Sequence, residues 1–263
     1  MKRYFRLYSK FLQQYIKSLM EYRIDFIFGL IGFILIRLAE VVFIKLIFNF
    51  IPTLSGWNIN QILFIYGLAQ IPKGIDHVFT DYLWIFSWKT IARGEFDRYL
   101  LRPLNPLFQV ISESFQPDGF GEIIVGIALF IISSVNLNLV FSFDKIIELI
   151  VVIFFATLIY TAVKLATTSI AFWVKFAQAH VFMAYQVSSF AKYPIGIYPG
   201  AIRFVLTFLI PFAFTGYYPG AYFLGNGSFL TGVVLTVLVG IISISLAYCI
   251  WLKGITVYES AGN

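Results

Sequence analysis

Two polar stripes interrupt the long apolar runs of this chain and hold the side chains best suited to do chemistry. In the first stripe, five polar residues follow one another at steps of 4, 3, 4 and 4: Tyr66, Gln70, Lys73, His77 and Asp81. That spacing keeps side chains within a narrow arc of one helix. Such an arc cannot face acyl chains cheaply. It is either the wall of a substrate cavity or proton relay, or a face that packs on neighbouring helices.

A second stripe has the same kind of spacing further along the chain. It consists of Thr157, Thr161, Lys164 and Thr168. The threonines can bond the carbonyls of their own helix. A charge such as that of Lys164 costs roughly 2.5 kcal/mol or more at the bilayer centre, so we expect it to face protein or water. Cavity lining and helix seam both remain open. The candidate translocation path therefore comprises Tyr66, Gln70, Lys73, His77, Thr157, Thr161, Lys164 and Thr168.

Two other groups of charged residues are less suggestive of chemistry. Asp76 and Asp81 lie about 140° apart on a helix, so together with His77 they do not predict a metal site. Arg37 and Glu40 are three residues apart on one helical face. They either neutralise each other or contact a helix of another subunit.

Composition identifies the environment of these stripes. Of the 263 residues, 60% are hydrophobic and 12% are charged, whereas a soluble domain carries about 25% charged residues. The apolar runs exceed the ~20 residues that an α-helix needs to cross a bilayer, and they lack the alternation of barrel strands. The sequence therefore predicts an all-α integral membrane protein in contact with lipid. Its net charge of +6 does not indicate a nucleic-acid partner.

The apolar runs predict a single transmembrane domain over residues 1–263 with six spans. The spans are expected at about 24–48, 59–83, 119–140, 146–173, 197–216 and 230–252. Residues 1–22 alternate basic and apolar positions, which predicts an amphipathic helix in the membrane interface. The fifth span cannot be one ideal helix, because Pro211 interrupts it. Residues 215–229 are then expected to dip back as a re-entrant element, packed against protein.

Residues 87–118 form a polar island between the second and third spans. Its charges fall within fourteen residues: Lys89, Arg93, Glu95, Asp97, Arg98 and Arg102. Pro103 and Pro106 are expected to end the helical pattern, because proline lacks an N–H and clashes with the preceding turn. The island therefore predicts a short amphipathic helix that a soluble partner can reach.

The distribution of Lys and Arg predicts the orientation. One side collects 13 basic residues from the connecting segments: Lys2, Arg3, Arg6, Lys10, Lys17, Arg23, Lys89, Arg93, Arg98, Arg102, Lys175, Lys192 and Lys253. The other side holds Lys145 alone. Both termini and the island are therefore expected in the cytoplasm, which six spans require.

The chain carries no phosphate-binding GxxxxGK[ST] motif, no Ser-His-Asp pattern and no CxxC. Its two Lys-Gly pairs run in the wrong order for a Walker motif. The sequence therefore predicts no enzyme, and any ATP that drives it is hydrolysed by another chain.

Three stretches carry a family resemblance. They are Gly94-Glu-Phe-Asp-Arg-Tyr-Leu-Leu-Arg-Pro-Leu-Asn-Pro106; Tyr193-Pro194 with Ile210-Pro-Phe-Ala-Phe214 and Tyr218-Pro219; and Trp251-Leu-Lys-Gly254 with Tyr258-Glu-Ser-Ala-Gly262. In these the chain resembles permease subunits of bacterial type-2 ABC exporters, in particular the six-span branch grouped with daunorubicin-like and viologen-type export systems. The resemblance covers nearly the whole chain.

The resemblance implies a multi-pass permease of the bacterial cytoplasmic membrane that exports a substrate, expected to be hydrophobic or amphipathic. It also implies a cytoplasmic coupling helix between spans two and three that docks on a separate ATP-binding ABC subunit. That partner binds ATP and Mg, so no cofactor is expected in this chain. A second permease chain completes the path, and a heterodimer is favoured over a homodimer.

The expected coupling residues combine charges for register with aromatic or aliphatic anchors. They are Trp88, Glu95, Phe96, Asp97, Arg98, Tyr99, Leu100 and Arg102. The alternative for the island is a solvated loop that only connects two spans. The alternative for the whole protein is an ATP-independent carrier or channel that uses His77, Asp81 and Lys164 as a relay.

Overall fold

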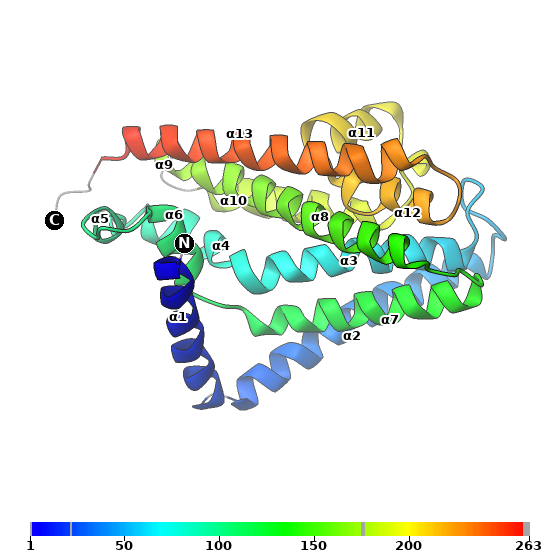
Figure 1. Cartoon of the computed structure of the whole chain (residues 1–263), viewed down its shortest axis with the longest axis horizontal. Helices are drawn as coiled ribbons and strands as arrows, with labels where there is room; N and C mark the ends of the chain where they lie inside the picture. The colour runs from blue at the N-terminus through cyan, green and yellow to red at the C-terminus, as the bar shows by residue number, and fades with distance from the viewer. Residues whose placement is uncertain (1, 22, 175–176, 260–263) are drawn as a thin grey trace.

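The computed structural model describes residues 2–21, 23–174 and 177–259. Within these ranges the chain is helical, and its only β-type pairing is an isolated bridge between Leu54 and Trp57. Five long helices run side by side along the longest axis (Figure 1). They are α2 (Arg23–Phe48), α3 (Ile59–Thr80), α7 (Phe120–Asn136), α8 (Phe143–Ser169) and α13 (Leu235–Val257).

Four continuous helical segments of the described residues are long and apolar enough to cross a membrane. They are Arg23–Phe48, Pro117–Asn136, Phe143–Val174 and Leu230–Val257. A bent pair, Gly200–Leu209 and Phe212–Phe223, makes up to five. The all-helical, multi-pass prediction is confirmed, whereas the count of six remains a prediction. The helix α3 is not among these spans because of its polar stripe, although its 22 residues are enough for about 30 Å of hydrocarbon.

The fifth segment is broken where the sequence predicts. The two helical halves meet at 72°, and Pro211 stands at the break. The second half contains α12 (Tyr217–Phe223). The pair lies at the end of the bundle away from α1 (Figure 1). After α8 the chain runs back toward that end already in α10 (Gln178–Ser188), which packs on α8. The chain therefore starts to run toward that end before residue 197, where the fifth span was predicted to begin; the bounds of that span remain a prediction.

The helix α3 is the centre of the bundle, and most of its side chains are buried. It approaches α7 through glycines. A Cβ added to Gly67 would lie 2.6 Å from the Phe130 nitrogen, and one added to Gly126 would lie 3.0 Å from the Ile71 nitrogen. Small residues let membrane helices approach this closely. The polar stripe of α3 is thereby held inside protein.

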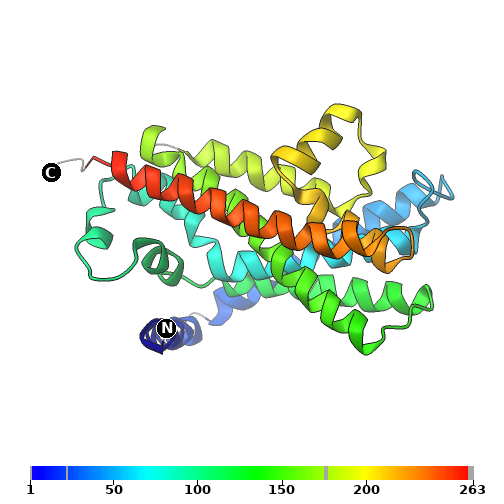
Figure 2. The same cartoon turned by 45° about the horizontal axis from the view of Figure 1, so that its top comes forward.

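The helix α1 (Lys2–Glu21) lies across one end of the bundle, where α13 also ends (Figures 1 and 2). Its Tyr4 ring contacts Phe108, and its Tyr15 ring contacts Phe115. The predicted helix is therefore present, although residues 1 and 22 of the range lie outside the described residues. Its place in the membrane interface remains a prediction.

We call this end the basic end, because it holds nine exposed Lys and Arg side chains among those whose exposure the structure describes: Arg6, Lys10, Lys17, Arg23, Lys89, Arg93, Arg98, Arg102 and Lys253. Lys175 and residues 260–263, which include the end of the closing motif, lie outside the described residues. The opposite end holds Lys145. It also holds Arg203 and Lys45, which the count of basic residues in the connecting segments did not include. Lys192, which was assigned to a cytoplasmic segment, pairs with Glu40 of α2 at 3.1 Å. The asymmetry nevertheless persists.

The polar island contains less helix than predicted. It consists of a π-helical turn at Phe86–Thr90, the one-turn helix α5 (Asp97–Leu100) and α6 (Pro106–Ser112). Pro106 begins a helix, contrary to the prediction that it ends one. The Asn105 side chain caps this helix by accepting from the Phe108 N–H at 3.1 Å. Proline suits a first helical position, where no N–H is needed.

Candidate functional site

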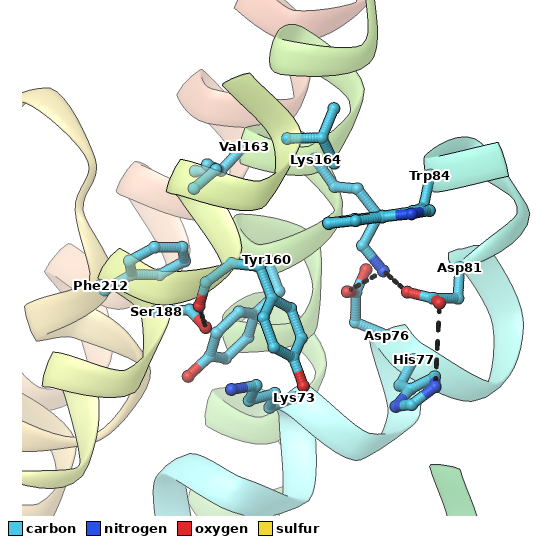
Figure 3. A pocket seen from close by; sticks show the side chains of 13 residues that line it. Lys73, Asp76, His77, Asp81, Trp84, Tyr160, Val163, Lys164, Ser188 and Phe212 are labelled. Carbon is cyan, nitrogen blue, oxygen red and sulfur yellow. Dashed lines mark hydrogen bonds and ion pairs between the residues drawn. The ribbon is translucent and has the colours of Figure 1, made fainter. Parts of the chain in front are cut away.

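The two predicted stripes meet at Lys164. The Lys164 Nζ lies 2.7 Å from Asp76 Oδ2 and 2.9 Å from Asp81 Oδ1. Figure 3 shows the ammonium between the two carboxylates, which follow one another along the end of α3. The lysine thus ties α8 to α3 with two ion pairs. An intramembrane charge is expected to have such partners.

Asp76 has further partners that hold its orientation. Its Oδ1 accepts hydrogen bonds from Thr80 at 2.5 Å and from Thr161 at 2.8 Å. Both threonines are buried. A buried carboxylate is tolerated when its remaining lone pairs are hydrogen-bonded. Thr161 of the second stripe therefore helps to hold the Asp76 carboxylate in the orientation that pairs with Lys164.

His77 lies beside three carboxylates without a direct hydrogen bond. Its ring nitrogens are 3.6 Å from Glu122, 3.8 Å from Asp81 and 4.0 Å from Asp118. Its ring stands edge-on to Phe33, with the centroids 4.9 Å apart. We call Lys164, Asp76 and Asp81 the Lys164 group. The histidine thus connects this group to α7, which carries Glu122.

A second set of charges lies on the α2 side of α3. Arg37 contacts Glu40 at 3.0 Å and Glu122 at 2.9 Å. Glu40 also accepts from the Tyr66 hydroxyl and pairs with Lys192. The predicted pairing of Arg37 with Glu40 is confirmed, but Arg37 also reaches Glu122 of α7.

The pocket beside Lys164 is narrow. It is lined by Lys73, Asp76, His77, Asp81, Trp84, Tyr160, Val163, Lys164, Val181, Ala184, Tyr185, Ser188 and Phe212. Its free volume of about 30 Å³ has room for about two water molecules. In this conformation the charged residues form ion pairs between α3 and α8, and we call this contact the seam. The pocket beside it does not admit a substrate.

The predicted path residues do not all line this pocket. Lys73, His77 and Lys164 do. Tyr66 and Gln70 lie on the α2 side, while Thr168 donates to the Leu83 carbonyl at 3.2 Å. Thr157 bonds the Ile153 carbonyl of its own helix.

Sequence reasoning missed the acidic partners of the two stripes. Glu122 is the one ionisable residue of α7, and its isolation in an apolar span was the available signal. Glu40 was assigned only to Arg37, and Asp76 was considered only as a metal ligand. Spacing along one helix does not indicate which residue of another helix lies opposite.

The aromatic residues of the island point inward. Phe96 is fully buried, and Tyr99 is 1% exposed. They pack with Phe86, Phe172 and Trp251, with the rings of Phe96 and Phe172 centred 5.2 Å apart. We call these five residues the aromatic cluster. The prediction that Phe96 and Tyr99 anchor a soluble partner was wrong, because they anchor the island to α8, α9 (Ala171–Val174) and α13 instead. The Trp88 side chain is also partly buried, with its indole nitrogen inside the protein.

What remains exposed is a short tip that follows α5. Leu101 is 85% exposed and Leu100 is 44% exposed, and Arg102 and Pro103 are also exposed. We call residues 100–103 the island tip. Gln109 of α6 fixes its base by donating to the carbonyls of Tyr99 at 2.9 Å and Leu104 at 3.0 Å.

The other predicted coupling charges surround the tip. Arg98 is exposed and pairs with Glu113 at 3.2 Å, and it also donates to the Tyr99 hydroxyl at 2.8 Å. Glu95 and Asp97 are partly exposed. Burial, together with the hydrogen bond to Tyr82, raises the pKa of Tyr99, so its phenol stays neutral.

The match to known families covers most of this architecture. The family model described as ABC-2 family transporter protein matches residues 34–262. The chain belongs to the ABC-2 transporter family. No curated protein and no solved structure matches it. As an ABC-2 protein it is a multi-pass membrane permease, a transport component that works with an ABC ATP-binding subunit.

The matched range includes the island, the Lys164 group and the broken fifth segment, while all of α1 lies outside it. The daunorubicin-like and viologen-type branch remains a prediction.

Proposed function

We propose that this ABC-2 protein is the permease subunit of an ATP-driven exporter in the bacterial cytoplasmic membrane, and that the island tip is where its ATP-binding subunit docks. The observation that carries the proposal is the contrast between the exposed Leu101 and the buried residues just before it. An exposed leucine pair flanked by arginines is typical of a contact surface, since apolar anchors give affinity and rim charges give register.

The tip is also mechanically connected to the bundle. Phe96 and Tyr99 lie immediately before it and pack against Phe172 and Trp251 at the ends of the long helices. A displacement of the tip therefore moves close-packed side chains, which do not absorb it as a loose linker would. This arrangement supports a coupling element over a solvated loop.

We place the basic end in the cytoplasm, with six spans that count α3 and the α10 crossing. The nine exposed basic residues at this end support the orientation, because cytoplasmic segments carry an excess of Lys and Arg. We also propose a second permease chain, with a heterodimer favoured. The exported substrate is hydrophobic or amphipathic.

The rival interpretation as an ATP-independent relay through His77, Asp81 and Lys164 is less well supported. Lys164 is held by two carboxylates at direct contact distance, and the pocket beside it holds about two waters. A firmly paired seam suits helix packing better than ion transfer.

Co-purification tests the docking surface. The tagged chain is expressed with an ABC ATP-binding subunit from the same organism, and the bound subunit is quantified. Replacing Leu100 and Leu101 together by Asp is expected to weaken the affinity about tenfold or more, since two apolar anchors are lost. The control is Phe143→Asp, which places an acid at an exposed position of the opposite end. Equal capture of the subunit by the tip variant and wild type would exclude the tip from docking.

A further inference from the structure

A second hollow lies on the α2 side of α3, next to the pocket of Lys164. It is lined by Arg37, Ala69, Gln70, Lys73, Tyr160, Ser188, Ser189 and Lys192. Three of these residues are basic, and none is acidic. The free volume of the hollow is about 10 Å³, which is room for about one water molecule. Arg37 and Gln70 lie near the middle of their helices.

Two buried donors on residues that line this hollow have no partner among the described residues. The Arg37 side chain is 8% exposed, and its Nε has no hydrogen-bond acceptor. Gln70 is 3% exposed, and its Nε2 is also unpaired. A buried donor without an acceptor costs about 1–3 kcal/mol. Two such donors in one hollow indicate an absent acceptor.

Lys73 adds a charge that the surrounding carboxylates do not neutralise. It is 6% exposed, and no described carboxylate lies within 4.0 Å of its Nζ, which instead stands 4.4 Å from the Tyr185 ring centroid. Figure 3 shows Lys73 near Tyr160, away from the contacts of Lys164 with the two aspartates. The carboxylates on this side are Glu40, which pairs with Arg37 and Lys192, and Glu122, which pairs with Arg37. One positive charge therefore remains in excess.

The geometry points to an anion-binding site. We propose that this hollow binds one acidic head group, a phosphate or a carboxylate, when its lining side chains move apart, with Lys73, Arg37 Nε and Gln70 Nε2 as the donors. A monoanion would balance the excess charge and satisfy both unpaired donors, and hydrogen bonds to charged groups are the stronger class. The acidic group belongs to a membrane lipid or to the transported amphiphile. Only its role as cargo rests on the proposed function.

Equilibrium binding of dodecyl phosphate to the purified chain in dodecyl maltoside micelles tests the site without an ATPase. Wild type is expected to bind saturably, and Lys73→Gln to bind about tenfold more weakly, because one charged contact is lost. The matched control is Lys45→Gln, which removes a charge from an exposed position of α2 and should leave binding unchanged. If Lys73→Gln does not fold, Gln70→Met replaces it, with a weaker loss expected.

Competition identifies the source of the acidic group. Displacement by sodium phosphate alone indicates a free anion. Displacement in nanodiscs that contain phosphatidylglycerol, but not in phosphatidylcholine alone, indicates a lipid head group. Displacement by neither indicates a specific acidic amphiphile. Absence of saturable binding, or equal binding by wild type, Lys73→Gln and Gln70→Met, would overturn the proposal. Because no transport is measured, failure here leaves the docking proposal intact.

Discussion

The middle of the bundle and its basic end are held together by opposite kinds of residue. Around α3, charged side chains from several helices are buried and paired, as with Lys164 between Asp76 and Asp81. At the basic end, the aromatic cluster packs the polar island onto the long helices, while the charges of the island face outward. Each environment thus buries the residue type that its solvent does not accommodate well.

This contrast explains how the middle of the bundle and the basic end can both be rigid although they lie in different environments. In the bilayer, association gains little from burying apolar surface, so polar contacts and close glycine packing hold the helices. In water, burying aromatic rings is the main stabilising term. The seam therefore fixes α3 against α8, and the core that contains the aromatic cluster fixes the island tip to α8, α9 and α13. A force on the tip has a continuous packed route to the seam.

Replacing Lys164 by Met should have the largest effect. It leaves the buried Asp76 and the partly exposed Asp81 without their lysine, and breaking such a buried pair costs about 3–5 kcal/mol. Unfolding in mixed micelles measures this loss. The control adds Asp76→Asn and Asp81→Asn to the same chain, and we expect it to recover most of the stability. A loss below about 1 kcal/mol for Lys164→Met would contradict the importance of the seam.

Phe96→Ala should destabilise the basic end by about 3 kcal/mol, because it opens a cavity in the aromatic cluster. Amide hydrogen exchange should show the loss of protection in residues 86–112 and in the last turns of α13. Leu101→Ala is the matched control, since that side chain is 85% exposed and its removal should change stability by less than about 0.5 kcal/mol. Equal effects of the two variants would mean that the island is not anchored by Phe96.

Glu113→Gln should have the smallest effect. Its ion pair with Arg98 is partly exposed, and such pairs contribute about 0–1 kcal/mol and are screened by salt. Thermal unfolding at low and high salt checks this expectation. A loss above about 2 kcal/mol would show that charge, and not the aromatic cluster, holds the island.

The sequence predicted the helical membrane architecture because long apolar runs and prolines act locally. The break at Pro211 and the helix of residues 2–21 follow from such local rules. The partners within the bundle could not be predicted in the same way. Lys192 was assigned to a cytoplasmic segment because it follows a polar stretch, yet it lies beside Glu40, and that contact depends on how α10 packs.

The island shows a similar limit. Phe96 and Tyr99 were interpreted as docking anchors because aromatic residues in a polar segment are typical of interfaces. Only the positions of Phe172 and Trp251, far away in the sequence, show that these rings complete an internal cluster. Leu101, which the prediction left out, is the most exposed large apolar side chain of the island at 85%.

Site-specific cross-linking tests the central claim, that the basic end docks on a separate ATP-binding subunit through the island tip. The native Cys249 is first replaced by Ser, and Leu101→Cys or Val140→Cys is then introduced; Val140 is 93% exposed at the opposite end. With a maleimide that carries a photoactivated benzophenone, we predict a cross-link to the ATP-binding subunit from position 101 and none from position 140. A cross-link from position 140, or none from position 101 in a complex that hydrolyses ATP, would contradict the account.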